Sequence, residues 1–139
     1  MKKLLTSRKI YVARSKITKA GRGVFAAQNI KRGDIIEVCP VILIPKNDVS
    51  NLKGSILINY YFYFGKKKDM LAIALGFGSI YNHSYEPSAT YKKKTKGSVI
   101  EFVAIKNIKK GEEITVNYNF GDPKDKTRLW IPEVPPFKG

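Results

Sequence analysis

His83 is the only histidine of the chain, and it lies between an asparagine and a serine in the segment Gly78–Pro87. A histidine side chain can act as a general base, or it can hold a neighbouring group through a hydrogen bond. Nucleophilic catalysis would need His83 to activate Cys39 or a serine, and the sequence has no recognised nucleophile elbow or orienting acid. The general-base role stays open, but the structural role is favoured because buried polar groups need partners.

A second segment with chemical potential is Gly21-Arg22-Gly23. Two glycines would let the backbone approach a bound molecule closely. The segment is not a dinucleotide-binding loop, because no helix follows it, and a plain turn is an equal alternative. Cys39 and His83 are too few for the three or four nitrogen and sulfur ligands of a zinc site, so we expect no metal site of that kind.

The elements that must position these residues are mainly short strands separated by turn-forming residues, with few segments periodic enough for a helix. The pattern predicts a mostly β fold. A chain of 139 residues buries one core, so we expect a single domain over residues 1–139. Asn47–Leu52 is predicted to form one or two helical turns. The predicted strands are Lys9–Arg14, Asp34–Ile44, Ile56–Phe64, Met70–Leu75, Ala89–Lys93, Ser98–Ile105 and Ile114–Tyr118.

One ten-residue pattern occurs twice in the chain, as NIKRGDIIEV from Asn29 and as NIKKGEEITV from Asn107. In both copies a glycine, Gly33 or Gly111, can adopt the positive φ that a tight turn requires. The isoleucine and valine that follow alternate at the period of a strand. We therefore expect two equivalent turns that lead into two strands. Chance similarity is the alternative, because this turn chemistry is common.

The charge distribution is strongly asymmetric. The net charge is +15 and the first acidic residue is Asp34, so the amino-terminal quarter is wholly cationic. Such a field favours nucleic acid or another polyanion, although a solvated surface explains it equally well. No apolar run approaches the roughly 20 residues that span a bilayer, and the amino end lacks the apolar core of a signal peptide. We expect no membrane partner and an intracellular protein, either cytoplasmic or chromatin-associated.

Taken in order, these segments resemble the motifs of the SET-domain family of protein-lysine methyltransferases, over roughly residues 20–120. The Gly-x-Gly of that family is matched by residues 21–23, its Asn-His-Ser-x-x-Pro segment by residues 82–87, and its Glu-Leu-Thr-x-x-Tyr segment by residues 113–118. The resemblance implies a mostly β, β-clip-like fold of several short sheets. It also implies that the last two segments form a pseudoknot near the carboxyl end and build the cofactor pocket.

The resemblance names a cofactor, S-adenosylmethionine, and the residues that would hold it. These are Gly21, Arg22, Gly23, Asn82 and His83. The contact would be made mainly through the Asn82 amide and the backbone around His83. No proton then needs to pass through the imidazole, and no metal is needed.

A second group of residues is expected to surround the substrate lysine. By its place in the resembled motif, Tyr118 supplies the central hydroxyl, and Tyr91 and Val116 lie where the family tunes the size of the channel. Tyr61 is a further candidate for the channel wall. Tyrosines suit this task because their rings shield the lysine stem and their hydroxyls orient the amine without adding charge. The alternatives are that Tyr61 is a core aromatic residue and that Tyr91 points to solvent.

The sequence departs from the family pattern in two places. Ser88 stands where the family often has an asparagine, which affects one hydrogen bond of the pocket, and the zinc-binding cysteines of many nuclear members are absent. The tail, residues 121–139, is therefore expected to close the substrate channel. In it, Trp130 and Phe137 could wall the channel or simply cap the core.

The implied function is transfer of a methyl group from S-adenosylmethionine to the side-chain amine of a protein lysine. The alternative is a basic nucleic-acid-binding β module without catalytic activity. A +15 enzyme repels basic substrates unless local acids intervene, so Glu86, Glu101, Glu112 and Glu113 are predicted to form an acidic mouth. A chromatin or ribosomal protein would suit as the substrate, with nucleic acid contacting the basic surface. The sequence specifies no oligomeric state.

Overall fold

The computed structural model describes residues 3–66, 70–119 and 121–129. Within these ranges the chain forms nine strands and two short 3-10 helices, which confirms the predicted mostly β fold. The strands are β1 (Ile10–Arg14), β2 (Arg22–Ala26), β3 (Ile35–Ile44), β4 (Tyr61–Phe64), β5 (Met70–Ala74), β6 (Asn82–His83), β7 (Ala89–Lys94), β8 (Val99–Ala104) and β9 (Glu113–Val116). The 3-10 helices are η1 (Lys46–Leu52) and η2 (Ile56–Asn59).

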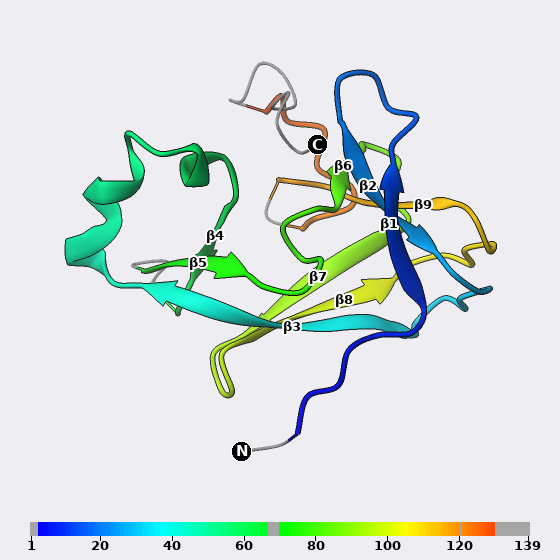
Figure 1. Ribbon diagram of the computed structural model, residues 1–139, viewed down its shortest axis with the longest axis horizontal. Helices are drawn as coiled ribbons and strands as arrows, with labels where there is room; N and C mark the ends of the chain where they lie inside the picture. The colour runs from blue at the N-terminus through cyan, green and yellow to red at the C-terminus, as the bar shows by residue number, and fades with distance from the viewer. Residues whose placement is uncertain (1–2, 67–69, 120, 130–139) are drawn as a thin grey trace.

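The strands form two sheets. The first has the order β1-β2-β9-β6, and the second has the order β4-β5-β3-β8-β7. All pairs are antiparallel except β6 with β9, which run parallel. Strand β3 runs along the length of the molecule and ends beside η1 (Figure 1). It thereby connects the two ends of the fold.

The second sheet contains an irregularity in β3. Its pairing with β8 shifts register between Ile35 and Glu37, so that Ile36 is the additional residue of a bulge. A regular strand turns successive side chains to opposite faces. Here both Ile36 and Glu37 are buried. The bulge therefore brings a carboxylate into the interior together with the isoleucine beside it.

The main core lies between the two sheets and takes side chains from both. Val24 and Ile114 come from the first sheet, and Ile100 and Phe102 come from the second; all four are fully buried. Tyr81 stacks on Phe102 with ring centroids 4.2 Å apart and an interplanar angle of 13°. Burial of aromatic and branched side chains of this kind is the main stabilising contribution to such a small domain.

The repeated sequence pattern forms two turns that are held together reciprocally. Ile30 and Ile108 exchange both backbone hydrogen bonds, each 2.8 Å long. The glycines that end the turns, Gly33 and Gly111, have φ of 91° and 89°. The prediction of two equivalent turns is confirmed. The structure adds that the two turns contact one another.

One strand prediction needs correction, and two short strands were missed. The predicted strand Ile56–Phe64 is a strand only from Tyr61, because Ile56–Asn59 forms η2. The cause is local: the Ser55 hydroxyl accepts a hydrogen bond from the Leu57 backbone amide and caps the helix. Strands β2 and β6 were not predicted, since β2 begins within the glycine motif and β6 has only two residues. Asn47–Leu52 lies within η1, as expected.

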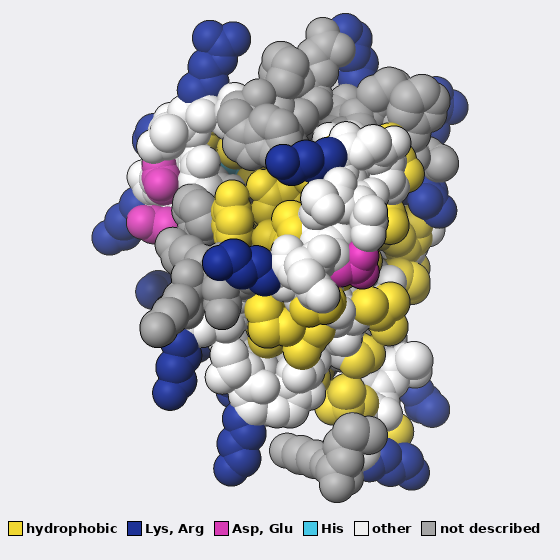
Figure 2. All heavy atoms as spheres, turned by 90° about the vertical axis from the view of Figure 1, so that its left-hand side faces the viewer, with side chains coloured by type: hydrophobic (Ala, Val, Ile, Leu, Met, Phe, Trp, Pro, Cys, Tyr) yellow, Lys and Arg dark blue, Asp and Glu magenta, His cyan; other side chains and the backbone are white. Residues whose placement is uncertain are grey.

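Figure 2 shows the face formed by η1, η2, β4 and β5. Hydrophobic side chains gather near its centre, and Lys and Arg side chains project from its margins. Exposed apolar residues on these elements and on the adjoining end of β3 include Ile42, Ile56, Leu57 and Tyr63. No helix in the described part of the chain is long and apolar enough to cross a membrane.

Candidate active site

The parallel pairing of β6 with β9 brings the two predicted motifs together. Asn82 lies opposite Thr115, and His83 lies opposite Val116. The backbone amide of Ser84 continues the pairing with a 2.9 Å hydrogen bond to the Val116 carbonyl. The segments that the sequence analysis assigned to one pocket are therefore adjacent strands.

The Glu113 carboxylate connects three of the site's elements. It accepts hydrogen bonds from the Ser15 hydroxyl at 2.9 and 2.8 Å and from Asn82 Nδ2 at 2.8 Å. Asn82 Nδ2 also donates to the Arg22 carbonyl at 2.9 Å. Glu113 is half-buried, so its carboxylate has lost part of its hydration, and these donors replace it. We call Ser15, Arg22, Asn82 and Glu113, with the adjoining Gly23, the Glu113 cluster.

The two glycines of the Gly-x-Gly segment are required for different structural reasons. Gly21 has a φ of 74°, which glycine adopts readily, and it ends the loop of the β1–β2 hairpin. Gly23 lies on β2, where a Cβ would overlap Glu113 Oε1 and lie 3.0 Å from Asn82 Nδ2. The segment is thus more than a plain turn, because Gly23 makes room for the Glu113 cluster.

Asn82 has a buried acceptor. Its side chain is fully buried, and its Oδ1 has no hydrogen-bond partner in the described part of the structure. Such an unsatisfied buried oxygen costs roughly 1–3 kcal/mol. It is therefore suited to accept a hydrogen bond from a bound ligand.

His83 makes a structural contact with the residue that follows β9. Its Nδ1 accepts a hydrogen bond of 3.0 Å from the backbone amide of Tyr118. Its ring also lies edge-on to Tyr85, with centroids 4.4 Å apart, and tilted against Tyr118 at 5.2 Å. Because Nδ1 is an acceptor here, it carries no proton. His83 therefore has the structural, hydrogen-bonding role that the sequence analysis favoured.

The Tyr118 hydroxyl is fixed by a short hydrogen bond. It donates to the Tyr81 carbonyl at 2.6 Å. Burial raises the pKa of Tyr118, and the nearby Tyr60, Tyr91 and Glu113 add to the shift. The hydroxyl is therefore neutral near pH 7 and keeps its proton for donation.

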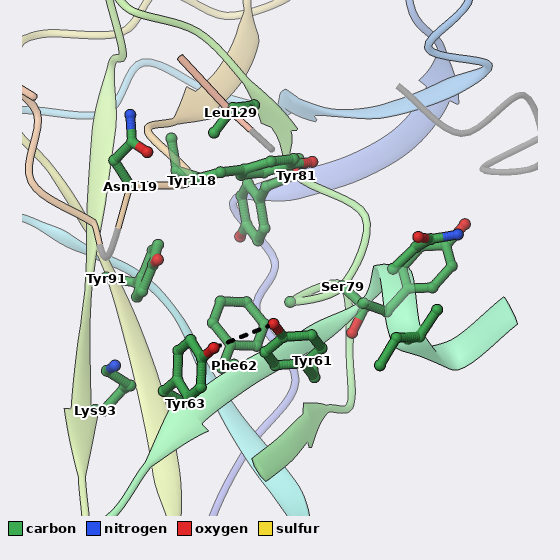
Figure 3. Close-up of a pocket in the computed structure, with 15 residues that line it drawn as sticks. Tyr61, Phe62, Tyr63, Ser79, Tyr81, Tyr91, Lys93, Tyr118, Asn119 and Leu129 are labelled. Carbon is green, nitrogen blue, oxygen red and sulfur yellow. Dashed lines mark hydrogen bonds between the residues drawn. The ribbon is translucent and has the colours of Figure 1, made fainter. Parts of the chain in front are cut away.

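A pocket of about 210 Å³ lies between β4, β7 and the segment after β9 (Figure 3). It is smaller than the roughly 300–1,000 Å³ of typical small-molecule sites, which suits one side chain better than a whole cofactor. Four of the predicted residues line it: Tyr61, Tyr91, Val116 and Tyr118. Trp130 and Phe137 lie outside the described residues. The full lining is Ile58, Asn59, Tyr60, Tyr61, Phe62, Tyr63, Gly78, Ser79, Tyr81, Tyr91, Lys93, Val116, Tyr118, Asn119 and Leu129.

The pocket tyrosines are held in a neutral state. Burial raises the pKa of Tyr61 to about 12, and its hydrogen bond to the Tyr63 hydroxyl adds to the shift. Burial also raises the pKa of Tyr60, which the charge of Arg22 partly opposes. A wall of neutral hydroxyls offers donors and acceptors without introducing a charge next to a ligand amine.

Tyr91 faces the interior, so the alternative that it points to solvent is wrong. Its side chain is buried, and its ring packs against Phe62 at 5.1 Å and Phe102 at 5.9 Å between centroids. Gly121 makes this arrangement possible, because a Cβ there would lie 3.2 Å from the Tyr91 ring. Burial raises the pKa of Tyr91, which keeps its hydroxyl protonated.

Sequence reasoning missed the pair Glu37 and Tyr81. The Glu37 carboxylate accepts hydrogen bonds from the Tyr81 hydroxyl at 3.0 Å and from the Phe77 backbone amide at 2.9 Å. It thereby supports the loop whose Tyr81 carbonyl receives the Tyr118 hydroxyl. The available signal was a lone glutamate in the apolar run I-I-E-V-C, a position at which buried acids are rare.

The predicted acidic mouth is not formed. Glu113 is bonded within the Glu113 cluster, Glu101 pairs with Lys94 at 3.0 Å, and Glu86 pairs with Lys126 at 3.6 Å. The described residues that line the pocket include Lys93 and no carboxylate. Proximity in the sequence did not place these acids together, because neighbouring strand residues face opposite sides. In the part of the chain that the structure describes, no group of three or more His, Cys, Asp and Glu side chains could hold a metal ion.

Comparison with known proteins defines the family. The SET domain family matches residues 21–119. A Schizosaccharomyces pombe protein named histone-lysine N-methyltransferase, H3 lysine-37 specific, is 31% identical over 100 residues, which are 72% of this chain and 67% of that protein. The crystal structure of a Plasmodium falciparum protein assigned as a histone methyltransferase is 30% identical, with a TM-score of 0.61, and the match covers 83% of this chain and 95% of that one.

A structure of Polycomb repressive complex 2 from Chaetomium thermophilum, bound to S-adenosylmethionine, shares the fold. It is 23% identical, with a TM-score of 0.70, and the match covers 84% of this chain and 16% of that one. The chain belongs to the SET-domain family. It is an S-adenosylmethionine-dependent protein-lysine N-methyltransferase, so the alternative of a binding module without catalytic activity is set aside.

The Glu37–Tyr81 contact predicts a stability effect. Tyr81→Phe keeps the ring on Phe102 but removes the hydroxyl, so the buried Glu37 carboxylate loses one of its two donors. We expect the free energy of unfolding, measured with urea, to fall by about 1–3 kcal/mol. Tyr85→Phe, which removes an exposed hydroxyl bonded to Thr127, is the control and should change it by less than about 0.5 kcal/mol. Equal effects of both variants would contradict the role of Glu37.

Proposed function

We propose that the chain methylates a lysine of a histone or of another chromatin protein. The observation that carries this proposal is the pocket of neutral tyrosines next to the Glu113 cluster. The names of the Schizosaccharomyces pombe and Plasmodium falciparum relatives support a histone as the substrate. A ribosomal protein would offer the same chemistry, a lysine in a protein that is bound to nucleic acid.

We propose that Gly21, Arg22, Gly23, Asn82 and His83 hold S-adenosylmethionine. The residues fit the group: its ammonium can donate to the buried Asn82 Oδ1, and its carboxylate suits the exposed Arg22. The bound cofactor supplies a methyl group on a positively charged sulfur. His83 contributes by fixing the Tyr118 backbone rather than by moving a proton.

The pocket must receive the substrate lysine as a neutral amine. A free lysine side chain has a pKa of about 10.4 and is almost wholly charged at neutral pH. Transfer into a small aromatic pocket removes hydration, and the described lining offers no carboxylate to stabilise the ammonium form. Both effects lower the lysine pKa and favour the nucleophilic amine.

The proposed roles of the pocket residues follow from their positions. Tyr118 orients the amine, because it lines the pocket and its hydroxyl is held by the Tyr81 carbonyl. Tyr91 limits the room beside the amine, and Val116 leaves the opposite wall open. Tyr61 forms part of the channel wall.

We propose that residues 1–139 act as one domain whose tail, residues 121–139, closes the substrate channel. Leu129 supports this, since it lines the pocket. Thr127 is tied to the site as well, because its carbonyl accepts hydrogen bonds from the Tyr85 hydroxyl and from Asn119 Nδ2.

We propose that the protein acts in association with chromatin inside the cell, and that its basic surface contacts nucleic acid. The net charge of +15 supports this partner. Without an acidic mouth, the enzyme gains little attraction for a basic peptide alone. Nucleic acid that carries both the enzyme and its substrate would overcome the repulsion.

Cofactor binding is predicted to depend on the Asn82 amide. Asn82→Ala removes the buried acceptor and should weaken the binding of S-adenosylmethionine more than Ser88→Ala does. Ser88 is the matched control, because its hydroxyl bonds the Thr115 backbone rather than the Glu113 cluster. Isothermal titration calorimetry, with and without a chelator, measures this. Equal affinities of the two variants, or binding that disappears with the chelator, would overturn the assignment.

Tyr118→Phe is predicted to keep the fold and most of the cofactor affinity but to lower methyl transfer by a factor on the order of 10² or more. Only one positioned hydroxyl is removed, and such groups act mainly in the transition state. Transfer of labelled methyl to a histone-tail peptide measures the rate. Turnover at the parent rate would reduce Tyr118 to a wall residue.

Tyr91→Phe is predicted to shift products toward higher methylation without abolishing activity. A methylated amine needs space to rotate into line, and the Tyr91 hydroxyl, or a water molecule that it anchors, occupies that space. Mass spectrometry of the product peptide at matched turnover gives the ratio of mono-, di- and trimethyl-lysine. Tyr11→Phe, on the exposed side of β1, is the control. An unchanged ratio in Tyr91→Phe rules out the size-limiting role.

A further inference from the structure

The reciprocal turns gather cations from segments far apart in the sequence. Arg32 lies beside the second turn, because its backbone amide donates to Asn107 Oδ1 at 2.9 Å, and the Lys110 amide donates to Asn29 Oδ1, also at 2.9 Å. Lys9 approaches the same region through its Nζ, which donates to the Ile35 carbonyl at 2.7 Å. We call the basic residues of this region the paired-turn surface: Arg8, Lys9, Lys31, Arg32, Lys106, Lys109 and Lys110.

The geometry of the turns points the lysines outward and close together. Ile30 and Ile108 form a hydrogen-bonded antiparallel pair, and both are buried. The residues that follow them, Lys31 and Lys109, are exposed. Ile30 and Ile108 are bonded directly to each other, so these two lysines begin neighbouring turns. The fold therefore places two exposed lysines on neighbouring turns.

This arrangement of like charges is unfavourable by itself. The acids in the same turns are Asp34, which accepts a hydrogen bond from the Lys31 backbone amide, and Glu112. Two carboxylates cannot neutralise seven cations. The backbone hydrogen bonds of the turns nevertheless hold the cations in place, so the surface is preorganised for an anion that would relieve the repulsion.

We propose that the paired-turn surface binds the phosphate backbone of nucleic acid. Each turn offers the same basic pair, Lys31-Arg32 and Lys109-Lys110, in the same backbone conformation. A repeated array of cations matches a polymer with a regular series of phosphates. An acidic patch on a protein has no such regularity. The surface therefore narrows the general nucleic-acid contact to one region of the fold.

The location of this surface leaves the pocket accessible. Figure 1 shows the two turns at the end of the molecule opposite η1 and η2. The ten residues of β3 separate these ends, a length of roughly 30 Å at about 3.3 Å per residue. Nucleic acid on the turns would not cover η2 and β4, which line the pocket. The enzyme could hold nucleic acid and a substrate lysine at once.

The structure also divides the cationic amino-terminal quarter. Arg8 and Lys9 precede β1 and lie with the paired turns, whereas Arg14, Lys16 and Lys19 lie at its other end, in and beside the hairpin loop. Strand β1 has five residues, so the two groups are roughly 17 Å apart. The amino end alone does not form one continuous surface, and the second turn completes the first group.

The test compares two variants of the full chain with equal charge loss. The first replaces Lys31, Arg32, Lys109 and Lys110 with Gln; the control replaces the exposed Lys46, Lys53, Lys92 and Lys96 with Gln. Fluorescence anisotropy measures binding to a 20-base-pair DNA duplex, to a 20-nucleotide RNA and to polyglutamate over a range of salt. No cofactor or substrate is needed, so the result is independent of the proposed histone methylation.

We expect the first variant to lose at least tenfold in affinity for DNA or RNA, and its slope of log K against log salt to fall by about 3–4, roughly 0.7–0.9 for each lost phosphate contact. The control should change by much less. The DNA and RNA arms identify which polymer is preferred. Equal losses in both variants, no binding by the parent, or equally tight binding of polyglutamate would overturn the proposal. The thermal melting temperature should be unchanged in both variants, which excludes misfolding.

Discussion

The Glu113 carboxylate is the constraint on which the site depends. It lies between the β1–β2 hairpin, β6 and β9, and its donors come from Ser15 and Asn82. A half-buried charge of this kind is stabilised by such donors, because part of its hydration is lost. Gly23, Asn82 and Glu113 are therefore held in one arrangement, although they belong to three separate motifs.

Three consecutive residues then connect this cluster with the aromatic pocket. The Tyr81 carbonyl accepts a hydrogen bond from the Tyr118 hydroxyl, and Asn82 Nδ2 donates one to the Glu113 carboxylate. His83 Nδ1 accepts one from the Tyr118 backbone amide. The Tyr81 backbone carbonyl and the His83 side chain thus contact Tyr118, whereas the Asn82 side chain contacts the hairpin and Glu113. A displacement of β6 would therefore disturb the proposed cofactor contacts and the lysine pocket together.

Most strands and the two equivalent turns could be predicted from the sequence. Alternating apolar residues indicate strands, and the repeated pattern with its glycine indicates the turns. That the segments containing β6 and β9 lie together came only from the family resemblance, and their parallel pairing was not predicted, since a strand of two residues carries no periodicity. The role of Glu37 could not be predicted, because it depends on a bulge that changes which face a side chain occupies. The acidic mouth failed for a related reason: sequence proximity does not determine on which side of a strand Glu101 lies.

The bond between Ser15 and Glu113 also bears on how the protein is made. These residues are 98 positions apart, and contacts of such long range form slowly because a large loop must close first. During synthesis β2 would have an unpaired edge until β9 has emerged, and such edges favour aggregation. The hairpin is rich in lysine and arginine, whose mutual repulsion discourages association of nascent chains at that edge. The basic amino end would thus reduce aggregation of the nascent chain before the active site has formed.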